Sequence, residues 1–170
     1  THFSGATFTL QAATTRIVDE YLVPRIAHLT ITHGQAGGGE VLLPEDSPVT
    51  ALVPTDNSLG DTWKQVGFDD TGWLSGTGGG GYERAASQTY TPLIGIDLLS
   101  PSIPAAMRID AHDDNINDNN SFYARYQFNV ADAGAVSILT LRVKYDDGFV
   151  AYLNGTRVTG RNDPTPLTWN

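Results

Sequence analysis

Residues 145–158 read Tyr-Asp-Asp-Gly-Phe-Val-Ala-Tyr-Leu-Asn-Gly-Thr-Arg-Val, an apolar run bounded by two turn signals. The first signal, Asp146-Asp147-Gly148, has the composition of a hairpin turn. The second, Asn154-Gly155, suits a type I′ turn, because both central residues of that turn need a positive φ. With a strand on each side of both turns, this segment predicts an antiparallel meander.

The sequence on the N-terminal side of this segment continues the β pattern. Residues 122–130 alternate apolar and other side chains, residues 136–145 form a longer predicted strand, and the short apolar pieces 41–43 and 49–53 are bounded by prolines. Short strands between turn clusters are typical of sandwiches and barrels, and prolines are tolerated at sheet edges. We therefore expect residues 40–170 to form an all-β, antiparallel β-sandwich.

Residues 1–39 carry different signals. Residues 7–10 and 27–31 alternate as strands do, and residues 34–39 are rich in glycine. Between the two predicted strands, Thr14 or Thr15 could cap a short helix that ends at Pro24. The apolar face of that helix would consist of Ile17, Val18, Tyr21 and Leu22. This part of the chain is predicted to be an N-terminal appendage or the tail of a preceding module.

Composition excludes several classes of protein. The formal net charge is −9 and the chain has two lysines, so its surface repels nucleic-acid phosphates. No apolar run reaches the roughly 18 residues that a membrane span requires, so membrane insertion is not expected. The absence of cysteine excludes disulfides, cysteine zinc sites and thiol nucleophiles. Lysine-poor, aspartate-rich chains without cysteine are common among exported bacterial proteins, which predicts a secreted or cell-surface location.

Four ordered blocks carry a family resemblance. They are Trp-Lys-Gln-Val-Gly-Phe-Asp-Asp-Thr-Gly-Trp at 63–73, Gly-Gly-Gly-Tyr-Glu at 79–83, Tyr-Ala-Arg-Tyr-Gln-Phe at 123–128, and the 145–156 segment. Together they resemble the galactose-binding-like jelly-roll modules of large secreted bacterial proteins of planctomycete type. These modules are similar to the sugar-binding domain of family 2 glycoside hydrolases.

The resemblance implies a jelly-roll sandwich that serves as an accessory module beside other domains. In the family, the segment that corresponds to residues 166–170 leads into further strands. The expectation is therefore a sandwich that lacks its last strands at its C-terminal end and is finished by later residues or by a partner chain. Bare strand edges would favour such pairing.

The stretch 110–120 is rich in Asp and Asn side chains, whose oxygen atoms are the ligands that calcium prefers. Its alternation resembles the first half of an EF-hand loop, but the required glycine is absent and Ala124 stands where the bidentate glutamate should be. An ordinary solvated loop would have the same composition. The predicted calcium ligands are Asp110, Asp113, Asn115, Asn117 and Asp118.

No catalytic constellation is predicted. Asp69-Asp70 and Asp146-Asp147 could be paired carboxylates for hydrolysis, but both pairs have the setting of structural turns. No Gly-x-Ser-x-Gly motif is present, and the glycine run 76–81 lacks the Gly-Lys-Ser/Thr ending of a phosphate-binding loop. We therefore expect a protein that is not an enzyme.

Aromatic side chains offer the alternative chemistry of sugar stacking. Trp63 and Trp73 are expected to pack in the core, whereas aromatic side chains in loops are more available to a ligand. The predicted carbohydrate-binding residues are Tyr82, Tyr90 and Trp169.

The leading hypothesis is a non-catalytic carbohydrate-binding-like accessory module whose partner is a polysaccharide or glycan. The alternative is a structural or assembly module of a surface protein that a partner chain completes.

Overall fold

We analysed a computed structural model of the chain, which describes the backbone of three N-terminal segments and both the backbone and the side chains of most later residues. The described residues are 2–8, 14–19, 28–33, 40–83, 90–109, 121–136, 138–146, 148–163 and 165–169. Within them the chain is mostly β-strand and has no α-helix, which confirms the all-β fold class.

Twelve strands and four short 3-10 turns make up the described elements. The strands are β1 His2–Phe8, β2 Thr14–Asp19, β3 His28–His33, β4 Glu40–Leu43, β5 Pro48–Leu52, β6 Leu74–Thr77, β7 Gly79–Gly81, β8 Ile94–Asp97, β9 Phe122–Gln127, β10 Leu139–Tyr145, β11 Phe149–Leu153 and β12 Thr156–Arg161. The 3-10 turns are η1 Thr62–Lys64, η2 Thr91–Leu93, η3 Ala105–Met107 and η4 Ala133–Ala135.

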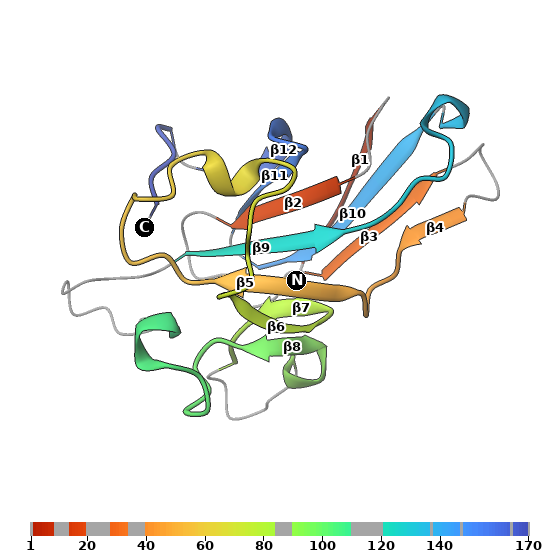
Figure 1. Cartoon of the computed structure of the whole chain (residues 1–170). Helices are drawn as coiled ribbons and strands as arrows, with labels where there is room; N and C mark the ends of the chain where they lie inside the picture. The colour runs from red at the N-terminus through yellow and green to blue at the C-terminus, as the bar shows by residue number, and fades with distance from the viewer. Residues whose placement is uncertain are drawn as a thin grey trace.

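The strands form two large antiparallel sheets and one small parallel pair (Figure 1). The four-stranded sheet has the order β1-β10-β3-β4, and the six-stranded sheet has the order β12-β11-β2-β9-β5-β6. Strands β7 and β8 form the parallel pair. A single hydrophobic cluster joins the two large sheets, with Leu141 and Val143 of β10 on one side and Ala124 and Tyr126 of β9 on the other.

The prediction of a helix around residues 17–22 is wrong for those of its residues that the structure describes. Ile17 and Val18 lie in strand β2, which pairs with β11 on one side and with β9 on the other; Tyr21 and Leu22 lie outside the described residues. The β-branched residues of this strand suit a pleated sheet. Backbone pairing on both sides outweighs the helical spacing of a few apolar residues.

The meander expected over residues 145–158 is half correct. Strands β11 and β12 form the predicted hairpin, with Asn154 at φ 50° and Gly155 at φ 83° in the two-residue turn. Strands β10 and β11, however, belong to different sheets. The segment after Tyr145 therefore crosses between the sheets, and the rings of Tyr145 and Phe149 meet across the core with their centroids 4.9 Å apart.

Strands from residues 2–33 lie inside both large sheets. Strand β2 lies between β11 and β9, while β1 and β3 flank β10. A boundary at residue 39 therefore does not separate the sheets. The hydrophobic strands β10 and β11 have these N-terminal strands beside them.

Candidate functional site

The outer face of the six-stranded sheet is partly covered by the loop that carries η1. Trp63 of η1 is fully buried and stacks on Tyr123 of β9, with ring centroids 4.2 Å apart and an interplanar angle of 5°. Trp63 and Tyr123 form a second hydrophobic cluster with Val150 and Tyr152 of β11. Because the main core covers the other face of β11, every residue of that strand is buried.

The Phe68-Asp69-Asp70 segment fastens this loop to the sheet, as the structural interpretation of these aspartates expected. Asp69 accepts a hydrogen bond from the backbone nitrogen of Thr71 at 3.1 Å. Asp70 Oδ2 lies 3.3 Å from Nε of the buried Arg125. Arg125 Nη1 also donates to the carbonyl oxygen of Phe68 at 2.9 Å. Both aspartates are therefore engaged in holding a turn.

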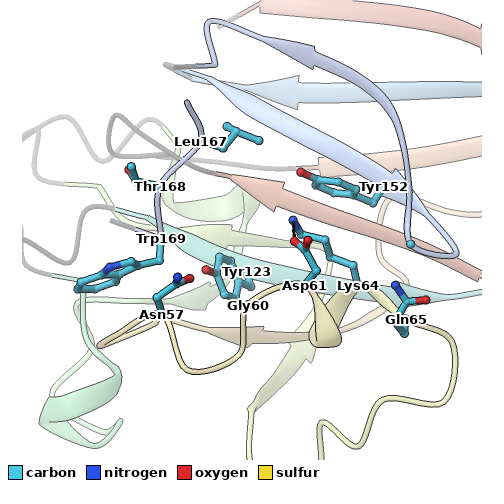
Figure 2. Close-up of a pocket in the computed structure, with 11 residues that line it drawn as sticks. Asn57, Gly60, Asp61, Lys64, Gln65, Tyr123, Tyr152, Leu167, Thr168 and Trp169 are labelled. Atoms are coloured by element: carbon cyan, nitrogen blue, oxygen red, sulfur yellow. Dashed lines mark hydrogen bonds and ion pairs between the residues drawn. The ribbon is translucent and has the colours of Figure 1, made fainter. Parts of the chain in front are cut away.

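A cavity of 670 Å³ opens where this loop meets the β11–β12 hairpin and the C-terminal segment (Figure 2). We call it the η1 cavity. Its lining combines aromatic rings with amide, hydroxyl, ammonium and carboxylate groups. It is lined by Asn57, Gly60, Asp61, Lys64, Gln65, Tyr123, Tyr152, Gly155, Leu167, Thr168 and Trp169.

Lys64 is the central charged group of the η1 cavity. Its Nζ lies 2.6 Å from Asp61 Oδ1 and 4.3 Å from the ring centroid of Tyr152. Burial by itself lowers the pKa of the Lys64 ammonium, but the hydrogen bond to Asp61 and the interaction with Tyr152 outweigh burial and raise that pKa. Lys64 is therefore held as a cation at neutral pH.

The β11–β12 turn forms a second wall of the η1 cavity. The backbone of Gly155 passes so close to Gln65 that an added Cβ would lie 2.7 Å from Gln65 Nε2. The positive φ of Gly155 is the feature that favours glycine here, because the end of the flexible Gln65 side chain could move away from an added Cβ. The hairpin turn that the sequence predicts thus also positions the amide of Gln65.

The C-terminal segment forms the third wall. The hydroxyl of the buried Ser121 donates a 2.7 Å hydrogen bond to the carbonyl oxygen of Trp169. Leu167 packs against the Trp63 cluster. These two contacts hold the C-terminal segment on the sheet, and the half-buried Trp169 lies beside Asn57 (Figure 2).

Of the three predicted sugar-stacking residues, Trp169 lines the η1 cavity. Tyr82 is 4% exposed and belongs to the core between the sheets, which corrects the expectation of a free surface ring. Tyr90 is half-buried, its backbone nitrogen donates to Glu83 Oε2 at 3.3 Å, and it does not line the η1 cavity.

Sequence reasoning missed the polar residues of the η1 cavity. Asn57, Asp61 and Gln65 resemble ordinary loop residues, and their grouping depends on the fold. One signal was present: Lys64 is one of two lysines and directly follows the buried Trp63.

The predicted calcium ligands Asp110, Asp113, Asn115, Asn117 and Asp118 lie outside the described residues. Among the residues that the structure does describe, no group of three or more metal-ligating side chains is found.

A second cavity, of 450 Å³, lies over β5, β6 and β9 beside the Arg125–Asp70 pair. Thr50 donates to Asp70 Oδ2 at 2.9 Å there, so the carboxylate has both a hydroxyl and a guanidinium neighbour. Since Asp70 is ion-paired with Arg125, and Arg125 in turn holds the carbonyl oxygen of Phe68, we assign this cluster a structural role.

Within the described part of the chain, no helix is long and apolar enough to cross a membrane. Comparisons with known protein families, with curated proteins and with solved structures each find no match.

Proposed function

We propose that this chain is a non-catalytic carbohydrate-binding module of galactose-binding-like, jelly-roll type, that it belongs to an exported or cell-surface protein, and that it holds a glycan in the η1 cavity. The observation that carries the proposal is the combination of the Trp169 indole with amide and charged groups in one cavity. Sugar rings present C–H faces that pack on aromatic rings and hydroxyls that need polar partners.

The non-catalytic part of the proposal is supported by what the paired aspartates do. A glycosidase needs two carboxyl groups facing a scissile bond. Asp69 instead holds the backbone of Thr71, and Asp70 is ion-paired with Arg125. The pair that first suggested hydrolysis is therefore committed to the fold.

The assignment to the galactose-binding-like class is supported by contacts between the motif blocks. The Phe-Asp-Asp block meets the 123–128 block through the Arg125 contacts with Phe68 and Asp70. The 145–156 block contributes Tyr152 and Gly155 to the η1 cavity, where Lys64 of the first block also lies. Three of the four blocks that carry the resemblance thus contribute to one face.

A glycan array followed by titration calorimetry tests the proposal. We expect Trp169→Ala to weaken binding of an array-positive glycan by about tenfold or more, because truncation of a tryptophan that anchors a bound partner costs about 2 kcal/mol or more. Tyr90→Ala is the matched control, because Tyr90 is a half-buried aromatic outside the η1 cavity. An array without hits, or equal losses in both variants, would contradict the proposed site.

Calcium is a separate part of the proposal, because the loop 110–120 has the composition of a calcium-binding segment. If the loop binds the ion, millimolar calcium should raise the melting temperature by mass action, and a chelator should reverse the increase. An unchanged melting temperature would assign these residues to an ordinary loop.

Assembly with another chain is the second candidate function, favoured by the edges of both sheets. Strands β12 and β6 are the outer strands of the larger sheet, and β1 and β4 are those of the smaller one. Val41 of β4 is a large apolar side chain that is 50% exposed. Light scattering after size exclusion should show a stable oligomer if these edges pair, and a monomer if they do not.

A further inference from the structure

The Lys64–Asp61 pair forms a fixed donor and acceptor on one wall of the η1 cavity. The Lys64 side chain is 12% exposed, and its Nζ lies near the face of the Tyr152 ring. An ammonium carries three donor hydrogens, of which the hydrogen bonds with the Asp61 and Tyr152 side chains use two. Donor capacity therefore remains beside the carboxylate.

Asp61 differs from Lys64 in its access to solvent. Its side chain is 85% exposed, so the carboxylate keeps acceptor capacity beyond the bond to Lys64. Figure 2 shows the pair between Tyr152 and Gln65, with Trp169 and Asn57 on the other side of the η1 cavity. A ligand in the η1 cavity therefore meets the ion pair on one wall and Trp169 and Asn57 on another.

We propose that this ion pair selects glycans by recognising two adjacent hydroxyls of a neutral sugar, an inference that rests on the proposed glycan-binding function. One hydroxyl donates to the Asp61 carboxylate, and its neighbour accepts from the Lys64 ammonium. Hydrogen bonds to charged groups are stronger than those between neutral groups. Both members of the pair are needed for this recognition.

The same pair discriminates against acidic sugars. Because Asp61 already neutralises Lys64, the carboxylate of a uronic acid finds no free cation and lies close to a like charge. Replacing Asp61 by asparagine keeps the shape of the side chain but removes its charge. The Lys64 cation then becomes available to an acidic ligand.

Calorimetry with two ligands tests this inference: a neutral oligosaccharide that the array identifies, and the corresponding uronic-acid oligosaccharide. We expect Asp61→Asn to lower the affinity for the neutral ligand by about tenfold or more and to raise the affinity for the uronic-acid ligand. The preference of the protein between the two ligands would then be reversed. Lys64→Met should lower the affinity for the neutral ligand without raising the affinity for the acidic one.

Glu45→Gln is the matched control, because Glu45 pairs with Lys144 at 2.8 Å on a surface away from the η1 cavity. This variant should leave both affinities unchanged. If the wild-type protein binds neutral glycans but Asp61→Asn leaves the preference unchanged, the ion pair is not the selective element and the glycan site still stands. If the wild-type protein binds neither ligand class, the proposed function itself fails.

Discussion

At the scale of single residues, the Arg125–Asp70 pair joins the loop that carries η1 to the large sheet. The Arg125 side chain is 1% exposed and that of Asp70 is 18% exposed. Burial lowers the pKa of Arg125, while the charge of Asp70 raises it in part. The carboxylate is thus the main compensation for a buried cation among the described residues.

Removal of the Asp70 carboxylate charge should destabilise the fold, because Arg125 would remain as a buried cation. We expect Asp70→Asn to lower the free energy of unfolding by about 3 kcal/mol, the lower end for breaking a buried pair, because Asp70 is itself partly exposed. Glu45→Gln breaks a more exposed pair and should cost about 0–1 kcal/mol. Urea denaturation of both variants checks this prediction, and equal costs would show that burial does not make the Arg125 pair special.

The Lys64 ion pair should make the stability of the protein depend on pH. Its pKa is raised from the ordinary value of 10.5, so its ion pair contributes stability that is fully present below pH 10.5 and is lost as the pH rises through the folded-state pKa. The stability difference between the wild-type protein and Lys64→Met should therefore be constant near neutral pH and shrink above 10.5.

Denaturation curves at a series of pH values measure this difference. Asp61→Asn serves as the control: because it removes the charge that helps to raise the Lys64 pKa, the loss of stability above pH 10.5 should be smaller in this variant. A difference between wild type and Lys64→Met that stays constant through the alkaline range would contradict the ion-pair geometry.

At the scale of elements, the β11–β12 hairpin links fold and site through its turn. Gly155 has a φ of 83°, and its backbone lies against Gln65. We expect Gly155→Ala to cost about 1–2 kcal/mol, the penalty for a side chain in left-handed backbone. The contact with Gln65 should add little, because the long side chain of Gln65 can move away.

The double variant Gly155→Ala with Gln65→Ala separates the two causes, since it removes the contact but keeps the backbone strain. Its stability should match that of Gly155→Ala after correction for Gln65→Ala alone; full recovery would identify the contact as the cause. Gly72→Ala is a control, because a Cβ there would meet nothing within 4 Å. Urea denaturation should show its stability unchanged or slightly raised.

At the scale of the whole molecule, the first three strands tie the N-terminal residues into both sheets. Removal of residues 1–39 takes β2 out of the middle of the six-stranded sheet and both neighbours away from β10. We expect the remaining residues 40–170 to lose cooperative unfolding, measured by circular dichroism during urea denaturation. A cooperative transition with an unchanged spectrum would instead support an N-terminal appendage.

Local sequence by itself determined the strand character of most of the chain and the β11–β12 turn. The Asn-Gly pair specifies its turn through backbone geometry alone, which needs no distant partner. Burial of Trp63 was also predictable, because a large aromatic ring within an aromatic block seeks a core. These features depend on neighbours in sequence.

Only the tertiary structure decided which strands pair and which residues meet. Nothing local to residues 145–149 distinguishes a hairpin from a crossing between sheets, because both need a turn between apolar strands. A short apolar segment fits both the helical and the strand period, so its spacing alone could not decide between them. Pairing with β11 on one side and β9 on the other made residues 14–19 the strand β2. The η1 cavity combines Lys64, Tyr152 and Trp169 from distant parts of the chain, so its chemistry exists only once the sheets and their covering loop are packed.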